Sequence, residues 1–135
     1  MKKIIFIIMV LAALTLAACG GGGSGAAAPA AVATVPAEFA GLTNPLGGEA
    51  AGAGAEVFKN NCESCHGSQG HGDGPAGMAL IPKPKDLAVF APTVTDDYLF
   101  WRITTGKPGT AMIAWKGVLT DEQIWQVIGF VRTLK

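Results

Sequence analysis

The sequence predicts a small all-α domain behind an apolar leader and a flexible linker. Three observations support this prediction. Apolar residues recur at helical spacing near the C-terminus, and threonine-led cap patterns stand at Thr95 and Thr120. Charge divides the 135-residue chain, since the first 55 positions hold four charged residues and the other 80 hold eight acidic and eight basic residues. We therefore expect the folded domain in residues 51–135.

The C-terminal helix carries the clearest local signals. Thr120 and Gln123 have the spacing of a capping box, and Leu119 and Ile124 are placed as a hydrophobic staple. Arg132 stands near the end of the helix, where the helix dipole is negative. The apolar face continues at helical spacing through Ile124, Val127, Ile128, Val131 and Leu134.

Two further helices are expected upstream. Thr95 and the acidic pair Asp96 and Asp97 begin one of them, and Gly106 ends it. A short helix before residue 62 is indicated by the spacing of small and apolar residues at Ala51, Gly54, Ala55 and Phe58.

The N-terminus has the shape of a signal peptide over residues 1–18. Two lysines precede residues 4–18, a stretch whose only polar member is Thr15 and which is shorter than the roughly 20 residues of a membrane span. The run Leu16, Ala17, Ala18 and Cys19 resembles the lipobox of bacterial lipoproteins. That resemblance implies cleavage before Cys19, lipidation of its thiol, and anchoring in the cell envelope on the extracytoplasmic, periplasmic face of a bacterial membrane. The alternative is an ordinary secretory signal with a chance cysteine.

Residues 19–50 are predicted to form a flexible linker. They are rich in glycine, alanine and proline, carry only two charged residues, Glu38 and Glu49, and lack apolar periodicity, so they cannot bury enough surface to offset the entropy of ordering. Two alternatives stay open: a short helix in the alanine-rich part, and docking of residues 38–42 on the folded domain. The net charge of zero and the pI near 6.7 argue against a nucleic-acid partner.

The most informative residues are Cys62, Cys65 and His66. They form the Cys-x-x-Cys-His pattern of covalent c-type haem attachment, in which both thiols lie on one face of a helical turn. The imidazole of His66 then reaches the iron as the proximal ligand. Three alternatives exist: a redox-active dithiol, a zinc site that adds His71, and a structural disulfide. We favour haem attachment over these three, because the signal peptide directs the motif to the compartment in which c-type haem is attached.

A second axial ligand is expected from methionine, because a Met and His pair is common in cytochromes c. Met1 and Met9 lie in the predicted signal peptide. Met78 follows His66 by only 12 residues, whereas Met112 follows it by 46 and lies between two predicted helices. We expect Met112 to be the second ligand of the haem iron and Met78 to fill a gap in the apolar core.

Residues 51–135 resemble a class I cytochrome c of the small bacterial type. The attachment motif, the glycine-rich segment 70–77 and the sequence from Gly106 to Met112 with Trp115 carry the resemblance, although Ile113 stands where the family commonly has proline. The resemblance implies a small cytochrome c fold, with helices wrapped around one covalently bound haem c. It also implies that the Pro75 carbonyl accepts a hydrogen bond from His66, and that Gly54 and Phe58 pack against Phe130.

The expected function is single-electron transfer by a membrane-anchored monohaem protein, not catalysis. Its expected partners are respiratory or photosynthetic membrane redox proteins, with a place as a fixed subunit of a respiratory complex as a variant. The alternative is a haem-based ligand sensor or peroxidase-like enzyme in which Met112 is displaceable. Four cations are candidates for a ring around an exposed haem edge, namely Lys83, Lys85, Lys107 and Lys116.

Overall fold

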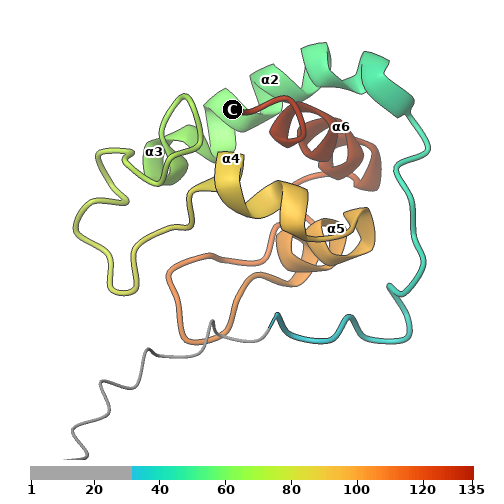
Figure 1. Cartoon of the computed structure of the whole chain (residues 1–135), viewed down its shortest axis with the longest axis horizontal. Coiled ribbons are helices and arrows are strands. Elements are labelled where there is room, and N and C mark those ends of the chain that lie inside the picture. Colours follow the sequence, from blue (N-terminus) through green and yellow to red (C-terminus); the bar gives the residue numbers. More distant parts are fainter. Residues whose placement is uncertain (1–31) are drawn as a thin grey trace, which may run out of the picture. The chain divides into compact units, whose positions relative to one another are not determined.

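The computed structural model describes residues 32–135, and the predicted signal peptide and Cys19 lie outside the described residues. The described part is helical and has no strand, apart from an isolated bridge between Lys116 and Leu119, so the all-α prediction is confirmed. None of its helices is long and apolar enough to cross a membrane. The elements are η1 (Gly47–Glu49), α2 (Ala50–Asn61), α3 (Glu63–His66), α4 (Leu87–Phe90), η2 (Ala91–Thr93), α5 (Asp96–Thr105) and α6 (Asp121–Val131) (Figure 1).

Helices α2 and α6 pack against each other more extensively than any other pair of helices in residues 32–135 (Figure 1). The contact is close because Gly54 has no side chain, and a Cβ built there would lie 1.9 Å from the backbone oxygen of Gln126. Beside it, the rings of Phe58 and Phe130 pack with centroids 5.1 Å apart. The expected packing of Gly54 and Phe58 against the last helix is thus present.

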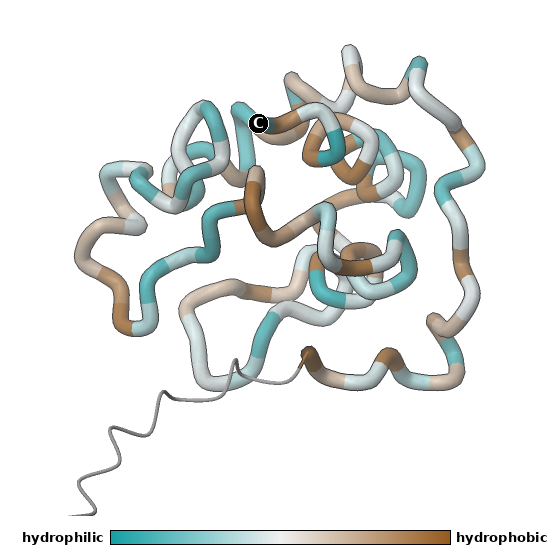
Figure 2. The backbone as a smooth tube through the Cα atoms, in the orientation of Figure 1, coloured by the Kyte–Doolittle hydropathy of each residue, from teal (hydrophilic) through white to brown (hydrophobic). Residues whose placement is uncertain are grey.

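Helix α5 completes the core by packing on α6. Phe100 stacks on Trp125 with ring centroids 4.3 Å apart and an interplanar angle of 24°. Buried side chains of α5 and α6 belong to one hydrophobic core, and both helices include hydrophobic stretches, drawn in brown in Figure 2. The largest fully buried side chains are those of Phe58, Ile124, Ile128 and Val127.

Helix α5 begins after Thr95 as predicted, but the Thr95 hydroxyl donates to the Asp97 carboxylate and does not cap the helix backbone. The termini of α6 follow the predicted chemistry, with one difference. Thr120 and Gln123 form the predicted capping box, in which the Gln123 amide donates to the Thr120 hydroxyl oxygen at 3.2 Å and the Thr120 amide donates to Gln123 Oε1 at 2.9 Å. Arg132 has a larger role than a charge at a helix end. It donates to the Asp96 carboxylate at 2.7 Å and to the backbone carbonyls of Ala91 and Val94, so it joins α6 to η2 and α5.

Residues 34–49, which we call the strap, lie against the folded domain, although the sequence places them in the flexible linker of residues 19–50. The Gly41 amide donates to Asp97 at 2.8 Å, the Asn44 side chain donates to the Trp125 carbonyl at 2.9 Å, and Phe39 packs on Phe100 with ring centroids 6.3 Å apart. The compact unit therefore begins at residue 34. These partners belong to α5 and α6, which explains why local composition does not reveal the docking, except for the alternative raised for residues 38–42.

Replacing Gly54 with alanine is expected to destabilise the protein by about 2 kcal/mol, because the new methyl group meets the Gln126 backbone and the two helices must separate. Gly52 is the matched control, since it lies in the same helix and a Cβ there would have no atom within 4 Å. Gly52→Ala should raise stability by about 0.5–1 kcal/mol. Urea unfolding of the two haem-loaded variants measures both effects, and equal midpoints would contradict the close-approach argument.

Candidate cofactor site

A cavity of about 580 Å³ lies between α3, α5, α6 and the loops 67–86 and 106–115. Its volume falls within the range of roughly 300–1,000 Å³ that is usual for cofactor sites. The walls are mainly hydrophobic, so a bound group is largely shielded from water. The apolar side chains on the walls are Phe58, Leu80, Leu87, Phe90, Leu99, Ile103, Ile113, Trp115, Val127, Ile128 and Val131.

Cys62, Cys65 and His66 all line this cavity. Cys62 is the last residue before α3, and its carbonyl accepts hydrogen bonds from the amides of Cys65 at 3.1 Å and His66 at 2.9 Å. This single helical turn places the two thiols and the imidazole together, as their spacing predicts. Burial, followed by the charge of Cys65, raises the pKa of the Cys62 thiol to about 12. A thiol held neutral in this way is a poor redox nucleophile.

The glycine-rich loop supports the back of this turn. A Cβ at Gly74 would lie 2.5 Å from the carbonyl oxygens of Glu63 and Ser64, and one at Gly77 would lie 2.1 Å from that of Cys65. The carbonyls that end α3 accept hydrogen bonds from the loop, for example from Ala76 to Ser64 at 2.9 Å. Glycines are needed here because the loop backbone touches the motif backbone.

The structure does not bring Pro75 to His66. Pro75 is exposed and does not line the cavity, and the neighbouring Ala76 amide donates to the Ser64 carbonyl of α3. The backbone of Lys85 lies beside the imidazole instead. Burial lowers the pKa of His66, and the nearby Lys85 backbone partly opposes this shift. His66 Nδ1 is buried, and no acceptor in residues 32–135 lies in good hydrogen-bond geometry with it.

Met112 lines the same cavity from the loop between α5 and α6. Its backbone is held in place, since its carbonyl accepts from the Lys107 amide at 3.0 Å and its amide donates to Thr110 Oγ1 at 3.2 Å. Gly106, with φ of +72°, packs so closely that a Cβ there would lie 2.7 Å from the Met112 carbonyl oxygen. Only glycine adopts this backbone angle readily, so Gly106 permits both the turn and the contact.

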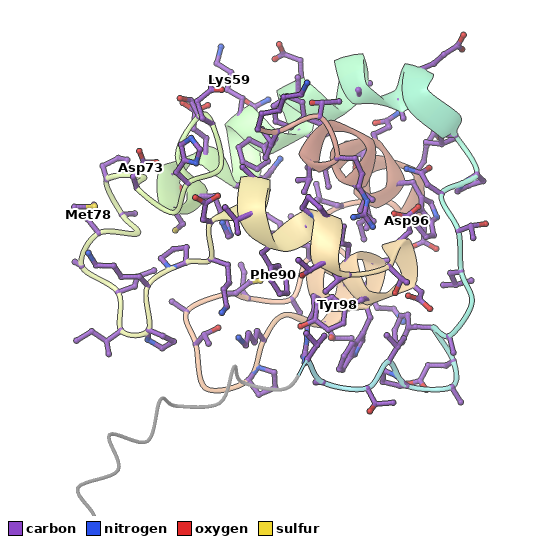
Figure 3. All side chains as sticks on the ribbon, viewed as in Figure 1. Lys59, Asp73, Met78, Phe90, Asp96 and Tyr98 are labelled. Carbon is purple, nitrogen blue, oxygen red and sulfur yellow. The ribbon has the colours of Figure 1, made fainter. Side chains whose placement is uncertain are left out.

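Met78 lies far from this arrangement. Its side chain is 55% exposed and is not on the cavity wall. Figure 3 shows it on the outer side of the loop between α3 and α4, pointing away from the fold. The geometry therefore favours Met112 over Met78 as a ligand, while the predicted role of Met78 as a space-filling core residue is wrong because the side chain faces solvent.

The residues present fit a covalently attached haem better than the three alternatives. The cavity joins two thiols, an imidazole and a thioether within hydrophobic walls, and the buried Nδ1 of His66 leaves Nε2 as the nitrogen available to iron. A zinc site gains no support, because no group of three His, Cys, Asp or Glu side chains in residues 32–135 is arranged to hold a metal ion, and His71 pairs with Asp86 at 3.2 Å. Cys62 and Cys65 are not joined by a disulfide.

The sequence analysis did not identify one residue of the cavity wall. Arg102 lines the cavity from α5, three residues after Leu99 and one before Ile103, both of which are also on the wall. An arginine on the apolar side of a predicted helix is the signal that could have identified it. Of the four candidate lysines for the haem edge, Lys83, Lys85 and Lys107 line the cavity and Lys116 does not.

Comparison with known proteins gives a consistent result. A family model described as "Cytochrome C oxidase, cbb3-type, subunit III" matches residues 49–131. Cytochrome c6 of Synechococcus elongatus is 36% identical over 78 residues, which make up 58% of this chain and 83% of that protein. Cytochrome c6 of Thermosynechococcus vestitus is also 36% identical over 78 residues, but these cover 64% of that protein.

A solved structure is similar as well. A chain of the Kuenenia stuttgartiensis reducing HAO-like protein complex superposes with a TM-score of 0.56 and 29% identity. The match covers 61% of the present chain and 41% of that chain. This domain thus resembles one part of a larger protein.

Replacing Met112 with alanine is expected to abolish the weak far-red absorption band that methionine-to-iron ligation gives in the ferric protein, because no other methionine of residues 32–135 lines the cavity. Met78→Ala is the matched control and should retain the band, since Met78 is exposed. Absorption spectra of the purified haem-loaded variants test this. Loss of the band in Met78→Ala, or its persistence in Met112→Ala, would reverse the assignment.

Proposed function

The chain belongs to the cytochrome c family, and on that premise we propose that it carries single electrons between membrane redox proteins while anchored in the cell envelope. It is a monohaem electron-transfer protein that holds one haem c, with Cys62 and Cys65 at the spacing of the attachment motif. Our proposal concerns three further properties, namely the membrane anchor, the redox partners and the localisation of the protein.

The observation that carries the carrier function is the meeting of His66 and Met112 on one apolar cavity. Haem supplies a one-electron couple when it is bound there. Both side chains line the cavity and would hold the haem iron, which would leave no open position on the iron for a substrate. The hydrophobic walls exclude water, and burial of this kind is one means by which a protein sets the reduction potential.

A second candidate function is a ligand sensor or peroxidase-like enzyme in which Met112 leaves the iron. The observation in its favour is Ile113, which replaces the family's usual proline and is 60% exposed. Against it, the hydrogen bonds of Met112 with Lys107 and Thr110 and the tight packing at Gly106 hold the loop without proline. We therefore favour the carrier.

The proposed partner surface is the cavity rim. Lys83, Lys85 and Lys107 lie there without any acidic neighbour on the wall, which suits a partner with an acidic patch around its own redox centre. Ile113 adds exposed apolar surface at the same rim. The likeness to part of a larger chain in the reducing HAO-like protein complex supports a variant of the proposal, in which the domain is a fixed subunit of an oxidoreductase complex.

The proposed anchor is a lipid on Cys19, on the periplasmic side of a bacterial membrane. Because the strap docks from residue 34, only residues 20–33 separate the lipid from the compact unit. A flexible chain of that length typically reaches about 20 Å, less than the full predicted linker would allow. The domain is then confined near its membrane partners, which raises its effective concentration there.

The carrier function predicts that carbon monoxide leaves the spectrum of the ferrous protein unchanged, because His66 and Met112 would together ligate the iron and leave no open position. Redox titration should follow a one-electron curve. Met112→Ala serves as the positive control, since opening one position should allow carbon monoxide to bind. Rapid binding by the unmodified protein would instead favour the sensor or peroxidase-like function.

The anchor predicts that Cys19→Ser moves the protein from the detergent-extracted membrane fraction to the soluble fraction while the haem content stays unchanged. Mass spectrometry of the unmodified protein should show a mature N-terminus at Cys19 carrying acyl chains. Cys19→Ser tests the anchor separately from the haem, since residue 19 lies before the compact unit. An unmodified Cys19 or a retained Met1 would contradict the proposal.

A further inference from the structure

The loop of residues 67–86 carries an exposed apolar segment at residues 78–82, which we call the apolar tip. No side chain in this segment is polar. Ile81 is 97% exposed and Met78 is 55% exposed, and Ala79 is exposed between them. These three residues do not line the cavity, so a cofactor bound there leaves them in water. Neighbouring apolar side chains exposed in this way mark an interaction surface more often than isolated ones do.

The base of this loop holds the apolar tip outward. The Leu87 amide donates to the Gly70 carbonyl at 2.7 Å, which joins the two ends of the loop. A Cβ at Gly72 would lie 2.5 Å from the backbone oxygen of Pro84, so the two arms of the loop also touch nearer to the tip. A surface presented on such a fixed base loses little conformational entropy when it binds.

Two exposed cations follow the apolar tip. They are Lys83 and Lys85, and residues 74–85 contain no acidic residue. Figure 2 shows the hydrophobic tip in brown and the hydrophilic stretch after it in teal. Apolar side chains beside lysines match the chemistry of a lipid interface, in which acyl chains lie below anionic headgroups.

The acidic residues on either side of this segment are directed to other partners. The Asp86 carboxylate lies 3.2 Å from His71 Nδ1 and accepts from the Val89 amide at 3.3 Å. Asp73 faces Gly67, since a Cβ built on that glycine would lie 1.9 Å from Asp73 Oδ1. Neither carboxylate therefore pairs with the lysines beside the apolar tip, which leaves their charge available to anionic headgroups.

The strap determines where the chain enters the compact unit. The strap runs antiparallel to α5, because the Asn44 amide donates to Asp96 at 3.3 Å and the earlier residue Phe39 packs on the later residue Phe100. Residue 34 therefore lies toward the C-terminal end of α5, where the loop 106–115 begins. In Figure 1 the start of the strap, the loop 106–115 and the outer part of the loop 67–86 all lie in the lower part of the view.

The length of the proposed tether makes this entry point important. A compact unit of this size is about 30 Å across. A flexible chain with the length of residues 20–33 typically reaches about 20 Å. The tether is thus shorter than the domain is wide, so the side on which the strap begins is held toward the membrane. This step rests on the proposed anchor, whereas the exposure and the charge of the apolar tip do not.

We propose that the apolar tip inserts into the surface of an anionic lipid membrane, with Lys83 and Lys85 among the headgroups. A lipid surface fits better than a protein partner, because a protruding tip without polar side chains offers no directional hydrogen bonds and a fluid surface needs none. The insertion adds a second membrane contact to the proposed lipid anchor. Lys107 and Ile113 belong to the other loop and remain available to a redox partner.

An environment-sensitive fluorophore tests the insertion. Haem attachment uses Cys62 and Cys65 and lipidation uses Cys19, so Ala79→Cys gives the mature haem-loaded protein one free thiol for a nitrobenzoxadiazole label. On vesicles of phosphatidylglycerol and phosphatidylcholine in equal parts, the emission should lie at shorter wavelength than on phosphatidylcholine alone. Lipids that carry a nitroxide should quench the label. Ile81 stays in place in this variant.

Val118→Cys is the matched control for the label. Val118 is 65% exposed and lies near Lys116, but Asp121 and Glu122 follow it and it does not line the cavity. A label there should show no shift and little quenching. An unshifted and unquenched label at residue 79 overturns the proposal and assigns the apolar tip to a protein partner. Equal quenching at the two sites also overturns it, since this would report only that the domain is close to the lipid.

Two substitutions in the labelled Ala79→Cys protein separate the apolar and the electrostatic contributions. Ile81→Ser should lower the equilibrium constant for insertion about tenfold. Lys83→Gln should lower it about fivefold, and added salt should remove this second effect. The 97% exposure of Ile81 means that its replacement leaves the fold and the haem content unchanged, which the absorption spectrum checks. Insertion that is the same in Ile81→Ser as in the parent would contradict the proposal.

Mass spectrometry of the same samples distinguishes failure of the anchor from failure of the insertion. If Cys19 carries no acyl chains, the proposed anchor is wrong. The labels at residues 79 and 118 are then compared with Cys19→Ser added to both proteins, which are mixed with the same vesicles. A shift at residue 79 alone still supports insertion of the apolar tip, and no shift at either site overturns it.

Discussion

The close approach of α2 and α6 is the constraint on which the rest of the structure depends. Gly54 lets the backbones meet, and at the same interface a Cβ at Gly129 would lie 3.1 Å from that of Ala50. Helix α2 ends at the attachment motif, while α6 contributes Val127, Ile128 and Val131 to the cavity wall. The distance between these two helices therefore sets where the motif lies relative to the wall that faces it.

The cavity combines hydrophobic shielding with one sign of charge. Apolar side chains from α5, α6 and both loops form most of its surface, and its ionised groups are cations. A domain of this size buries a modest core, so a large apolar cofactor held by two covalent bonds supplies part of the missing interior. Both features suit the proposed electron transfer, since shielding from water affects the reduction potential and cations at the rim would attract a partner with an acidic surface.

Several parts of the fold were predictable because their signals are local. The capping box of Thr120 and Gln123 and the end of α5 at Gly106 follow from residues within one or two helical turns. The attachment motif is equally local, and its helical turn places Cys62, Cys65 and His66 as the spacing indicates. The docking of the strap and the acceptors of Arg132 were not predictable in this way, because their partners lie 36 to 81 residues away.

The sequence by itself determined the helical class, the haem-attachment motif and the lipobox-like segment at Cys19, because periodicity and motif spacing are properties of neighbouring residues. The tertiary structure decided which side chains share the cavity. It brought Met112 to the wall, left Met78 and Pro75 in solvent, placed the Lys85 backbone beside His66, and turned Arg102 inward. These outcomes depend on where the chain reverses at Gly74 and how the loop packs at Gly106, and only the folded backbone fixes such contacts.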